Sequence, residues 1–374
     1  MKILHVITSL STGGAEKLMV DLLPRLRTVN QETHPDILAD TVELVVFDGK
    51  RTHFFDELEE AGIKIHVFGN NVYSISNAFK LIKFIHKFDI IHAHLSICQY
   101  YLAFARILAY NGAKLVTTEH NATNRRRHNL MFYILDKIVY SQYQKIVSIG
   151  DQTRQNLEKY IGMKHKMVTI YNGVDLTKIQ NAKRSRTPDD GKVVITMVAA
   201  FRKQKDQETL IKAMTLLPDK YYLQLVGGGE YLEKVKHFAK QQEQMPEGKN
   251  MNGRVEFLGI RSDIPQIMKD SDILVLSSHW EGLSLSSIES MASGHPFVAS
   301  DVDGLREIVN GYGILFPHQD YKQLAKIIEK LAEDSTYANE VANRCMEKAN
   351  QYSIEKMASA YYRLYKELTR NNRQ

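Results

Sequence analysis

The chain has 374 residues with a formal net charge of +6 at pH 7, and 44% of its residues are hydrophobic and 25% charged. This composition excludes a disordered or fibrous chain, and the length predicts two or three domains. With only two cysteines, Cys98 and Cys345, a disulfide framework is excluded and a reducing cytosol is favoured. No apolar run approaches the ~20 residues that cross a bilayer. The mild positive charge fits an anionic small molecule, an acidic membrane or nucleic acid without choosing among them.

Short Val- and Ile-rich runs alternate with amphipathic stretches along the first half of the chain. The amphipathic stretches include residues 15–27 and 76–88, which are predicted as helices. Near-continuous apolar strands separated by helices predict a parallel sheet covered on both faces, with right-handed connections. Seven runs are predicted as strands, at residues 1–8, 41–47, 64–69, 89–94, 114–120, 145–150 and 167–173.

The alternation lapses at residues 177–192, which are polar and rich in turn residues and are predicted to be a linker. Because the alternation then resumes, residues 1–176 and 193–352 are predicted as two consecutive α/β domains. A ligand of such domains binds at the carboxyl ends of the strands, and we expect it in a cleft between the two domains. The strands expected in the second domain are residues 193–200, 221–227, 254–259, 272–278, 296–301 and 313–317.

Gly13 and Gly14 follow the first predicted strand and open a helix. Glycines permit close backbone approach, and the free amides of a helix start favour a phosphate. An ordinary tight turn between a strand and a helix explains the pair equally well. The spacing differs from the six-position dinucleotide fingerprint, which weakens a hydride-transfer function.

Three histidines lie near the ends of predicted strands. His92 and His94 share one face of a strand, but they are a weak metal signal because no third ligand follows at a suitable spacing. His120 ends the next strand, where active-site groups gather. From position alone, a structural role for His120 is the more frequent explanation.

Cationic and glycine-rich loops follow the first two strands of the second domain. Arg202, Lys203 and Lys205 crowd the exit of one strand and suit a diphosphate, since Arg offers bidentate contacts and Lys a point charge. A solvated charged loop is the plainer alternative. Residues 227–229 are three glycines between a strand and a helix and are a weak candidate for a phosphate cradle.

Two glutamates, Glu281 and Glu289, flank a loop of Gly, Leu and Ser after a predicted buried strand. The run from Ser286 to Glu289 matches a capping box, in which the Glu bonds to the amide of the cap residue, and Glu281 is then an ordinary loop carboxylate. A ligand with both phosphate and hydroxyl groups would instead use the helix start and the two carboxylates together.

The order and spacing of these motifs resemble the retaining GT-B glycosyltransferases of the E-x7-E type, which are glycosyltransferase family 4-like and include relatives of sucrose synthase and of bacterial mannosyl- and glucosyltransferases. The resemblance spans nearly the whole chain. It implies an α/β GT-B fold of two Rossmann-like parallel-sheet domains that face a central cleft, with a C-terminal helix at 353–374 packed back on the first domain. The matching segments are GG at 13–14, HAH at 92–94, TTEH at 117–120, YNGVD at 171–175, QKD at 204–206, LVGGGE at 225–230, EFLG at 256–259, EGLSLSSIE at 281–289 and PFVASDVDG at 296–304.

The resemblance also implies roles for single residues of a nucleotide-sugar site. Glu281 would hold hydroxyls of the donor sugar, Glu289 the ribose hydroxyls and Lys205 the diphosphate, while His120 would contact the donor sugar. Glu281, His120 and Lys205 are thus the catalytic candidates. Further donor contacts are implied at Gly14, Arg202, Gly282, Ser284 and Leu285 toward the diphosphate, and at Gly259, Ile260 and Arg261 toward the base.

Three positions depart from the family pattern. The arginine usual at one position is Ala200 here, and Arg202 is the nearest substitute. Ser284 and Asp206 replace common glycines. A catalytically silent member that only binds nucleotide is therefore one alternative, although Glu281 and its partner glutamate are both present.

The implied reaction moves a hexose or N-acetylhexosamine from a nucleoside diphosphate sugar, with UDP favoured because it is common, and retains the anomeric configuration. Front-face attack is favoured because the sequence places no carboxylate pair of the kind that a retaining glycosidase needs at ~5 Å. Lys205, Arg202 and helix-start amides would stabilise the leaving diphosphate, so no metal or other cofactor is expected. Asp301 and Asp303 are a superficial metal pair, and their place before Gly304 suits a sugar-facing loop better.

The acceptor site is expected in the first domain. Basic residues beside aromatic ones suit the interface of an anionic membrane, although an ordinary helix packed on a sheet looks similar. A glycan or polyprenyl-linked acceptor is expected, with the enzyme cytoplasmic and peripheral on the inner face of the plasma membrane, in surface polysaccharide assembly. The segment 123–145 carries the basic and aromatic residues Arg125, Arg126, Arg127, Phe132, Tyr133, Tyr140 and Tyr143.

Two other functions fit parts of the sequence. A nucleotide-sugar epimerase can use the same architecture, but the two glutamates at this spacing argue against it. A nucleic-acid-binding protein would use Arg125–Arg127 and Lys183–Arg184. The positive charge is spread out and no nucleic-acid-binding motif occurs, so no nucleic-acid partner is expected.

Overall fold

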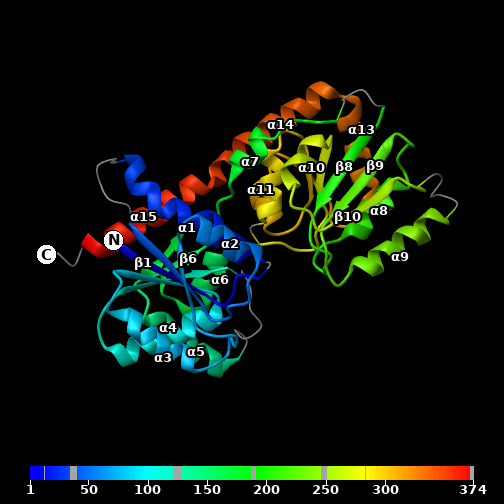
Figure 1. Ribbon diagram of the computed structural model, residues 1–374. Helices are drawn as coiled ribbons and strands as arrows, with labels where there is room; N and C mark the ends of the chain where they lie inside the picture. The colour runs from blue at the N-terminus through cyan, green and yellow to red at the C-terminus, as the bar shows by residue number, and fades with distance from the viewer. Residues whose placement is uncertain are drawn as a thin grey trace. The chain divides into compact units, whose positions relative to one another are not determined.

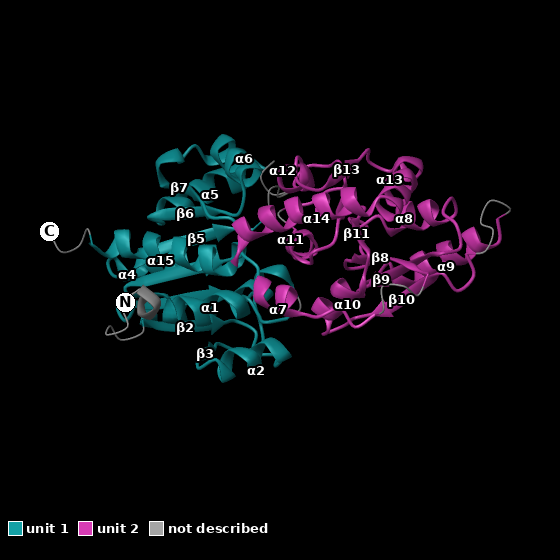
Figure 2. Cartoon of the chain, turned by 90° about the horizontal axis from the view of Figure 1, so that it is seen from above, with its two compact units in different colours: residues 1–174, 354–374 teal, residues 175–353 magenta. Residues whose placement is uncertain are grey.

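The computed structural model describes residues 1–11, 13–33, 40–120, 129–186, 191–245, 251–282 and 284–370 (Figure 1). The chain divides into two compact units, shown in two colours in Figure 2. Unit 1 consists of residues 1–174 together with the C-terminal segment 354–374, and unit 2 consists of residues 175–353. Each unit is therefore considered by itself.

Unit 1 is built on a parallel sheet that, in the described residues, has seven strands in the order β3-β2-β1-β4-β5-β6-β7. The strands are β1 (Lys2–Ile7), β2 (Thr41–Val46), β3 (Lys64–Val67), β4 (Ile90–His94), β5 (Lys114–Glu119), β6 (Lys145–Ser148) and β7 (Met167–Thr169). Both faces of β1 are buried, with Ile3 and Ile7 on one face and Leu4 and Val6 on the other. The runs predicted as strands are confirmed, because a sheet covered on both faces needs apolar residues throughout.

Helices cover the two faces of this sheet with two separate apolar cores. The core on one face includes side chains of α1 (Gly14–Thr33), α2 (His53–Glu60) and α15 (Ile354–Arg370). The core on the other face includes side chains of α3 (Ser76–Ile85), α4 (Ser96–Ala109), α5 (Leu130–Ser141) and α6 (Asp151–Ile161). A short 3₁₀ turn, η2 (Lys164–Lys166), precedes β7. Figure 1 shows α3, α4 and α5 together on one side of the sheet.

The C-terminal helix α15 is part of the core of unit 1 although it follows all of unit 2 in the sequence. It packs on α1, and Tyr361 and Tyr365 are fully buried. Their hydroxyls reach the sheet, where Tyr361 lies 3.0 Å from Thr118 Oγ1 and Tyr365 lies 2.5 Å from His92 Nδ1. Burial of two such aromatic side chains makes α15 a large contributor to the stability of unit 1.

Unit 2 contains a second parallel sheet, which in the described residues has six strands in the order β10-β9-β8-β11-β12-β13. The strands are β8 (Val193–Val198), β9 (Tyr221–Val226), β10 (Val255–Gly259), β11 (Ile273–Leu276), β12 (Phe297–Ser300) and β13 (Ile314–Phe316). They match the predicted runs. The helical elements are α7 (Leu176–Asn181), α8 (Gln207–Met214), α9 (Leu232–Glu243), α10 (Ile264–Asp270), α11 (Leu285–Ala292), α12 (Leu305–Val309), α13 (Tyr321–Glu333), α14 (Ser335–Ala349) and η3 (Asn350–Tyr352).

The segment 177–192, predicted as a linker, begins with structure instead. Asp175 caps helix α7 by accepting a hydrogen bond of 3.1 Å from the amide of Thr177, and Leu176 and Ile179 bury their side chains in unit 2. The prediction missed this helix because it is short and most of its residues are polar.

Arg184, one of the residues considered for nucleic-acid binding, lies further along the same segment. Its guanidinium forms an ion pair of 2.5 Å with Asp272, and Arg186 also pairs with Asp272. This part of the segment is therefore fastened to unit 2 by ion pairs.

None of the described helices combines the length and apolar character needed to cross a bilayer.

Candidate donor-binding site and its relatives

Two loops of unit 2 meet at the carboxyl ends of β8 and β11, which are neighbours in the sheet. One loop carries Gln204 and Lys205, and the other carries Ser278 and Glu281. A backbone bridge joins Lys205 to Ser278, and the amide of His279 donates to the carbonyl of Gln204 over 2.8 Å. Strand pairing therefore brings the QKD segment to the first glutamate of the E-x7-E motif.

The carboxylate of Glu281 is held by three side chains. Lys205 Nζ forms an ion pair with Oε1, Ser278 Oγ donates to the same oxygen over 2.6 Å, and Gln204 Nε2 donates to Oε2 over 2.9 Å. The side chain of Glu281 is 5% exposed and that of Lys205 is 13% exposed. Because three donors hold it away from water, this carboxylate is a fixed, charged hydrogen-bond acceptor.

Gly304 shapes the backbone next to Glu281. Its φ is +83°, and a Cβ atom on it would lie 2.4 Å from the carbonyl oxygen of Glu281 and 2.5 Å from that of Gly282. The amide of Glu281 donates to the carbonyl of Asp303 over 3.3 Å. Glycine is required at this position by both conformation and space, so the loop of Gly304 sets the position of Glu281.

Asp301 and Asp303, the superficial metal pair of the sequence, are both engaged by one arginine. Arg306 forms ion pairs of 2.6 Å with Asp301 and 3.4 Å with Asp303. The same ion pair with Asp301 raises the pKa of Arg306. A single arginine thus pairs with both carboxylates.

Helix α11 starts at Leu285, directly after the loop of Glu281, and its N-cap is Ser284. Ser286 therefore lies inside the first turn, and Glu289 is the fifth residue of the helix, so the capping-box interpretation of this pair is wrong. Ser287 Oγ donates back to the carbonyl of Ser284 over 2.7 Å. No side-chain hydrogen bond from the N-cap residue satisfies the described helix start, and uncapped first-turn amides suit an anion.

The end of β10 carries the three residues predicted to face a base. Gly259 has a φ of +66° and accepts a hydrogen bond of 2.8 Å from the amide of Gly227. Ile260 is 83% exposed, and Arg261 forms two hydrogen bonds, of 2.8 and 2.6 Å, with Asp263. This pairing raises the pKa of Arg261 and lowers that of Asp263. An apolar side chain beside an exposed backbone edge is a suitable platform for a planar base.

The cationic side chains of the loop after β8 do not point to one common site. Lys205 turns to Glu281, whereas Arg202 and Lys203 are exposed and have no side-chain partner among the residues that the structure describes. The substitute for the arginine missing at Ala200 is thus a surface cation. The adjacent glycines are explained by packing, because a Cβ at Gly227 would lie 2.2 Å from the carbonyl oxygen of Ala199.

Asp206, another departure from the family pattern, has a structural role. As the N-cap of α8 it accepts hydrogen bonds from the amide and hydroxyl of Thr209 over 3.1 and 2.6 Å. Its Oδ2 lies 3.8 Å from His279 Nδ1, and His279 Nδ1 lies 2.9 Å from His318 Nε2. The three side chains are close enough together to hold a metal ion, but the carboxylate is committed to the helix cap.

In unit 1, Gly13 and Gly14 differ in their surroundings. A Cβ at Gly14 would meet nothing within 4 Å, whereas a Cβ at Gly13 would lie 2.2 Å from Glu16 Oε2. Burial raises the pKa of Glu16. Gly14 is exposed and leaves room for a ligand, while Gly13 makes room for the side chain of Glu16.

Four histidines gather near the carboxyl ends of β1, β4 and β5. His5 Nδ1 lies 3.0 Å from His94 Nε2, and His94 Nδ1 lies 3.1 Å from His120 Nε2. His92 stacks on His94 with ring centroids 4.2 Å apart, and its own Nε2 lies 2.8 Å from Thr118 Oγ1. His120 thus lies at the strand end as predicted, and it contacts the buried imidazole of His94.

Burial keeps these rings neutral. Burial lowers the pKa of His5 to about 3 and that of His120 to about 4. It also holds the pKa values of His92 and His94 well below the ordinary range, with a further lowering from the neighbouring imidazoles. At neutral pH the four rings are therefore hydrogen-bonding groups without charge.

The aromatic residues predicted at a membrane interface occupy two different environments, since Phe132 and Tyr133 are partly exposed and the other two are not. Tyr140 and Tyr143 are buried in the core of unit 1, so the expectation that they face a membrane is wrong. They lie on the inner side of α5 and just after it, where their hydroxyls bond to Glu119 over 2.7 Å and to the carbonyl of Gln99 over 2.7 Å. Arg125–Arg127 lie outside the described residues.

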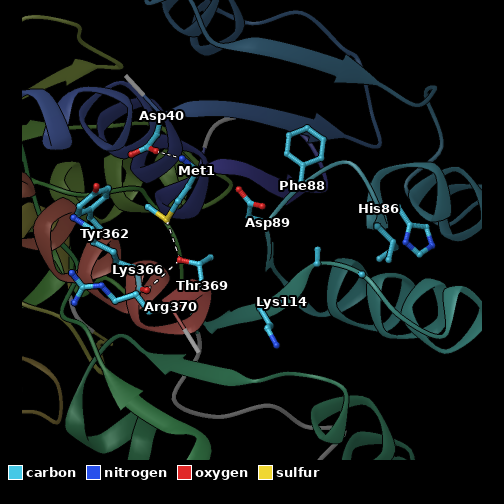
Figure 3. Close-up of a pocket in the computed structure, with 13 residues that line it drawn as sticks. Met1, Asp40, His86, Phe88, Asp89, Lys114, Tyr362, Lys366, Thr369 and Arg370 are labelled. Atoms are coloured by element: carbon cyan, nitrogen blue, oxygen red, sulfur yellow. Dashed lines mark hydrogen bonds and ion pairs between the residues drawn. The ribbon is translucent and has the colours of Figure 1, made fainter. Parts of the chain in front are cut away.

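A cavity of about 650 Å³ lies at the amino-terminal ends of the strands of the unit 1 sheet (Figure 3). Its lining includes Met1, Asp89 and Lys114, which precede or begin β1, β4 and β5, together with Lys366 and Arg370 of α15. Ligands of parallel α/β sheets bind at the carboxyl ends of strands. This cavity is therefore not the expected donor site.

Sequence reasoning missed several residues of the site. Gln204 and Ser278 bind Glu281, and His5 reaches the histidine group from another strand. Gln204 adjoins Lys205 in the sequence, which was an available signal. No local signal identifies His5, because its contact with His94 spans 89 positions.

Two family models match the chain in tandem. Residues 12–178 match the model described as Glycosyltransferase Family 4, and residues 178–352 match the model described as Glycosyl transferases group 1. Together the two matches run from residue 12 to residue 352, and the chain belongs to the glycosyltransferases that these two models describe.

Individual relatives and a solved structure agree with this assignment. The UDP-Gal:alpha-D-GlcNAc-diphosphoundecaprenol alpha-1,3-galactosyltransferase of Escherichia coli is 27% identical over 319 residues, 80% of each chain. The N,N'-diacetylbacillosaminyl-diphospho-undecaprenol alpha-1,3-N-acetylgalactosaminyltransferase of Campylobacter jejuni is 30% identical over 188 residues, 49% of this chain and 46% of the relative. The crystal structure of Anabaena HepE in complex with UDP superposes with a TM-score of 0.81 at 23% identity, covering 98% of this chain and 100% of HepE. The predicted α/β GT-B fold class is confirmed.

Proposed function

We propose that this glycosyltransferase moves a hexose or N-acetylhexosamine from a UDP-sugar to a glycan or polyprenyl-linked acceptor, with retention at the anomeric carbon. The observation that carries the proposal is the buried ion pair of Lys205 and Glu281 at the strand ends of unit 2, directly before the uncapped start of α11. The pair offers an acceptor for sugar hydroxyls and a cation for a diphosphate at one place. HepE was crystallised with UDP, and the E. coli relative is named for UDP-Gal, which favours uridine.

Each predicted residue has a proposed role in holding the donor. In unit 2, Glu281 accepts from sugar hydroxyls and Glu289 from ribose hydroxyls. The diphosphate is bound by Lys205, by exposed Arg202 and by the amides around Gly282, Ser284 and Leu285. The base lies along Gly259, Ile260 and Arg261. From unit 1, Gly14 approaches the diphosphate and His120 contacts the sugar.

The proposed chemistry is front-face attack. As the bond to the diphosphate breaks, negative charge grows on the leaving group, and Lys205 and the helix-start amides stabilise it. The leaving phosphate takes the proton of the acceptor hydroxyl. A covalent intermediate on Glu281 is disfavoured because Lys205, Ser278 and Gln204 already hold its carboxylate oxygens. The cation and the amides supply the charge stabilisation, so we propose that no metal is needed.

The surface of α3, α4 and α5 favours a lipid-linked acceptor at a membrane. The sequences of α3 and α4 contain Lys80, Lys83 and Arg106 and no acidic residue. The acidic residue of α5, Asp136, is buried and accepts a hydrogen bond of 3.0 Å from Tyr160. We call the exposed apolar residues of these helices the apolar face: Phe79, Phe104, Ile107, Leu108, Leu130, Met131, Ile134, Leu135 and Ile138.

An apolar face flanked by cations suits the interface of an anionic bilayer. The two relatives described above are named for acceptors on diphosphoundecaprenol, and such lipids reside in membranes. We therefore propose that the protein works at the cytoplasmic face of the membrane as a peripheral enzyme of polysaccharide or glycolipid assembly. Nucleic acid is not a proposed partner.

A thermal-shift panel of UDP-, GDP- and ADP-sugars tests the donor. A ligand at 100 times its Kd stabilises the folded protein by about 2.7 kcal/mol, so UDP-sugars should raise the melting temperature most. Glu289→Ala should weaken that response, and Glu340→Ala, at an exposed position of α14, should not. A response to no nucleotide sugar, or an unchanged response in Glu289→Ala, contradicts the assignment. If a metal chelator abolishes turnover, the metal-free mechanism is contradicted.

A further inference from the structure

Two buried histidines, His5 and His94, and the partly buried His120 form a continuous chain of hydrogen bonds. The first link joins His5 Nδ1 to His94 Nε2 over 3.0 Å, and the second joins His94 Nδ1 to His120 Nε2 over 3.1 Å. The links connect β1, β4 and the end of β5, which are adjacent strands of one sheet. The pairing of β1 with β4 therefore positions the first link, and His120 follows directly after the last residue of β5.

Each imidazole ring in this chain of histidines carries one N–H proton. Burial keeps all three rings neutral at pH 7, and a neutral imidazole has one N–H donor and one acceptor nitrogen. His94 bonds through both nitrogens, so it donates one bond and accepts the other. The chain must run either from His5 to His120 or from His120 to His5.

The far end of the chain decides between these two directions. His5 Nε2 is buried and has no hydrogen-bond partner among the described residues. If the chain ran toward His5, this nitrogen would carry a proton and would be a buried N–H without an acceptor. In the other direction it holds only a lone pair. Orphaned buried N–H groups are the rarer of the two in folded proteins, which favours donation from His5 through His94 to His120.

We propose that His5 and His94 are positioning residues that fix His120 as the tautomer with its proton on Nδ1. In this tautomer Nε2 accepts from His94, and Nδ1–H is the group that the ring can offer as a hydrogen-bond donor. Given the proposed function, in which His120 contacts the sugar nucleotide, the chain presets His120 to donate to a hydroxyl or phosphate oxygen of that substrate. The ring need not change its protonation when the substrate binds.

Nitrogen NMR of the full chain tests the tautomer without any substrate. Protein labelled with ¹⁵N-histidine is examined at pH 7.5 by long-range ¹H–¹⁵N correlation, and the signals are assigned with single substitutions. We expect His120 and His94 to be protonated on Nδ1, and His5 on Nδ1 as well. Protonation of His120 on Nε2 overturns the proposal, whatever the activity of the enzyme.

Substitutions at His94 test the positioning role. His94→Phe fills the space but cannot donate, whereas His94→Asn keeps an amide donor near the place of Nδ1. With His94→Phe we expect the Nδ1–H preference of His120 to be lost and KM for the sugar nucleotide to rise about fivefold, the effect of one neutral hydrogen bond. His94→Asn should recover part of both effects.

His92→Phe is the matched control, because His92 is equally buried and stacks on His94 but lies outside the chain. It is expected to lower stability and to leave the tautomer of His120 unchanged. If His94→Phe folds and binds the sugar nucleotide as the wild type does while His120→Ala loses binding, the positioning role is wrong. If the tautomer is as proposed but no sugar nucleotide binds, the proposed function fails. The proposed direction of the hydrogen bonds from His5 through His94 to His120 then still stands.

Discussion

Glu281 carries a carboxylate into a nearly water-free part of unit 2, and its neighbours determine whether that charge is tolerated. Lys205 balances the charge, and Ser278 and Gln204 supply hydrogen bonds to the remaining lone pairs. A buried ion pair is a weak source of stability, but removing one partner is expensive because the other is left without compensation. The same contacts that hold Glu281 in place thus make this part of unit 2 sensitive to single substitutions.

The first prediction concerns this pair. Lys205→Met should destabilise unit 2 by about 3 kcal/mol, since it leaves a buried carboxylate without its cation. Adding Glu281→Gln to it should recover part of the loss, which a double-mutant cycle in urea measures. Trp280 adjoins Glu281 in the sequence, and as the chain has one Trp, its fluorescence reports this unit. Either single substitution should lower transfer activity by roughly 100-fold. Additive stabilities would show that the two side chains are not coupled.

A pair of glycines gives the second prediction. Gly14→Ala should fold with the stability of the wild type, because its Cβ meets open space, and should raise KM for the sugar nucleotide. Gly304→Ala is the contrasting variant, since its Cβ would collide with the carbonyl oxygen of Glu281, and should cost more than ~1 kcal/mol. Thermal melts and donor kinetics separate the two. A normal KM for Gly14→Ala would remove Gly14 from the donor site.

At the scale of helices and strands, the sequence was most informative where burial is uniform. The strands could be predicted because a parallel sheet covered on both faces requires continuous apolar runs, as in β1 and β11. The start of α11 was predicted wrongly because serine side chains suit several positions around a helix end, and α7 was missed because it is short and mostly polar.

The site was predictable only in part. The two glutamates and Lys205 stood out through their spacing and their place after strands. The contacts of Glu281 with Gln204 and Lys205 bridge more than 70 positions, and they exist because β8 pairs with β11, an order that periodicity does not reveal. The same holds for His5 and His94, which meet through the pairing of β1 with β4.

The third prediction concerns the apolar face of α3, α4 and α5. The double substitution Ile107→Glu/Ile134→Glu places two negative charges there and should weaken binding to vesicles with anionic lipid by more than about 10-fold. Flotation of the full chain with such vesicles measures the effect. Met245→Glu changes an equally exposed residue of unit 2 and serves as the control. Equal binding by all three proteins would contradict membrane association through this face.

At the scale of the whole molecule, the fourth prediction links the buried histidines to pH. Their pKa values are lowered in the folded state, so below about pH 6.5 the unfolded chain takes up protons that the native chain does not. Stability is therefore retained above pH 6.5 and falls as the pH drops toward 4, by about 1.4 kcal/mol per pH unit for each such histidine. The described part of unit 1 contains four of them, and unit 2 contains His295, with a pKa of about 4.

Urea unfolding between pH 7.5 and 5 tests this difference. Circular dichroism reports both units, and the fluorescence of Trp280 reports unit 2. The transition of unit 1 should move to lower urea much faster with falling pH than that of unit 2. Parallel movement of the two transitions would show that the histidine group does not remain neutral in the native state.

The division of the chain has a consequence for biosynthesis. Helix α15 supplies Tyr361 and Tyr365 to the interior of unit 1, yet it is the last described element to leave the ribosome. Unit 2, a continuous segment, precedes it, whereas the face of the unit 1 sheet that α1 and α2 cover lacks the side chains of α15 until that helix is made. Since domains fold as units and exposed apolar surface invites aggregation, we expect the amino-terminal part of unit 1 to be the segment most prone to aggregate until α15 has been translated.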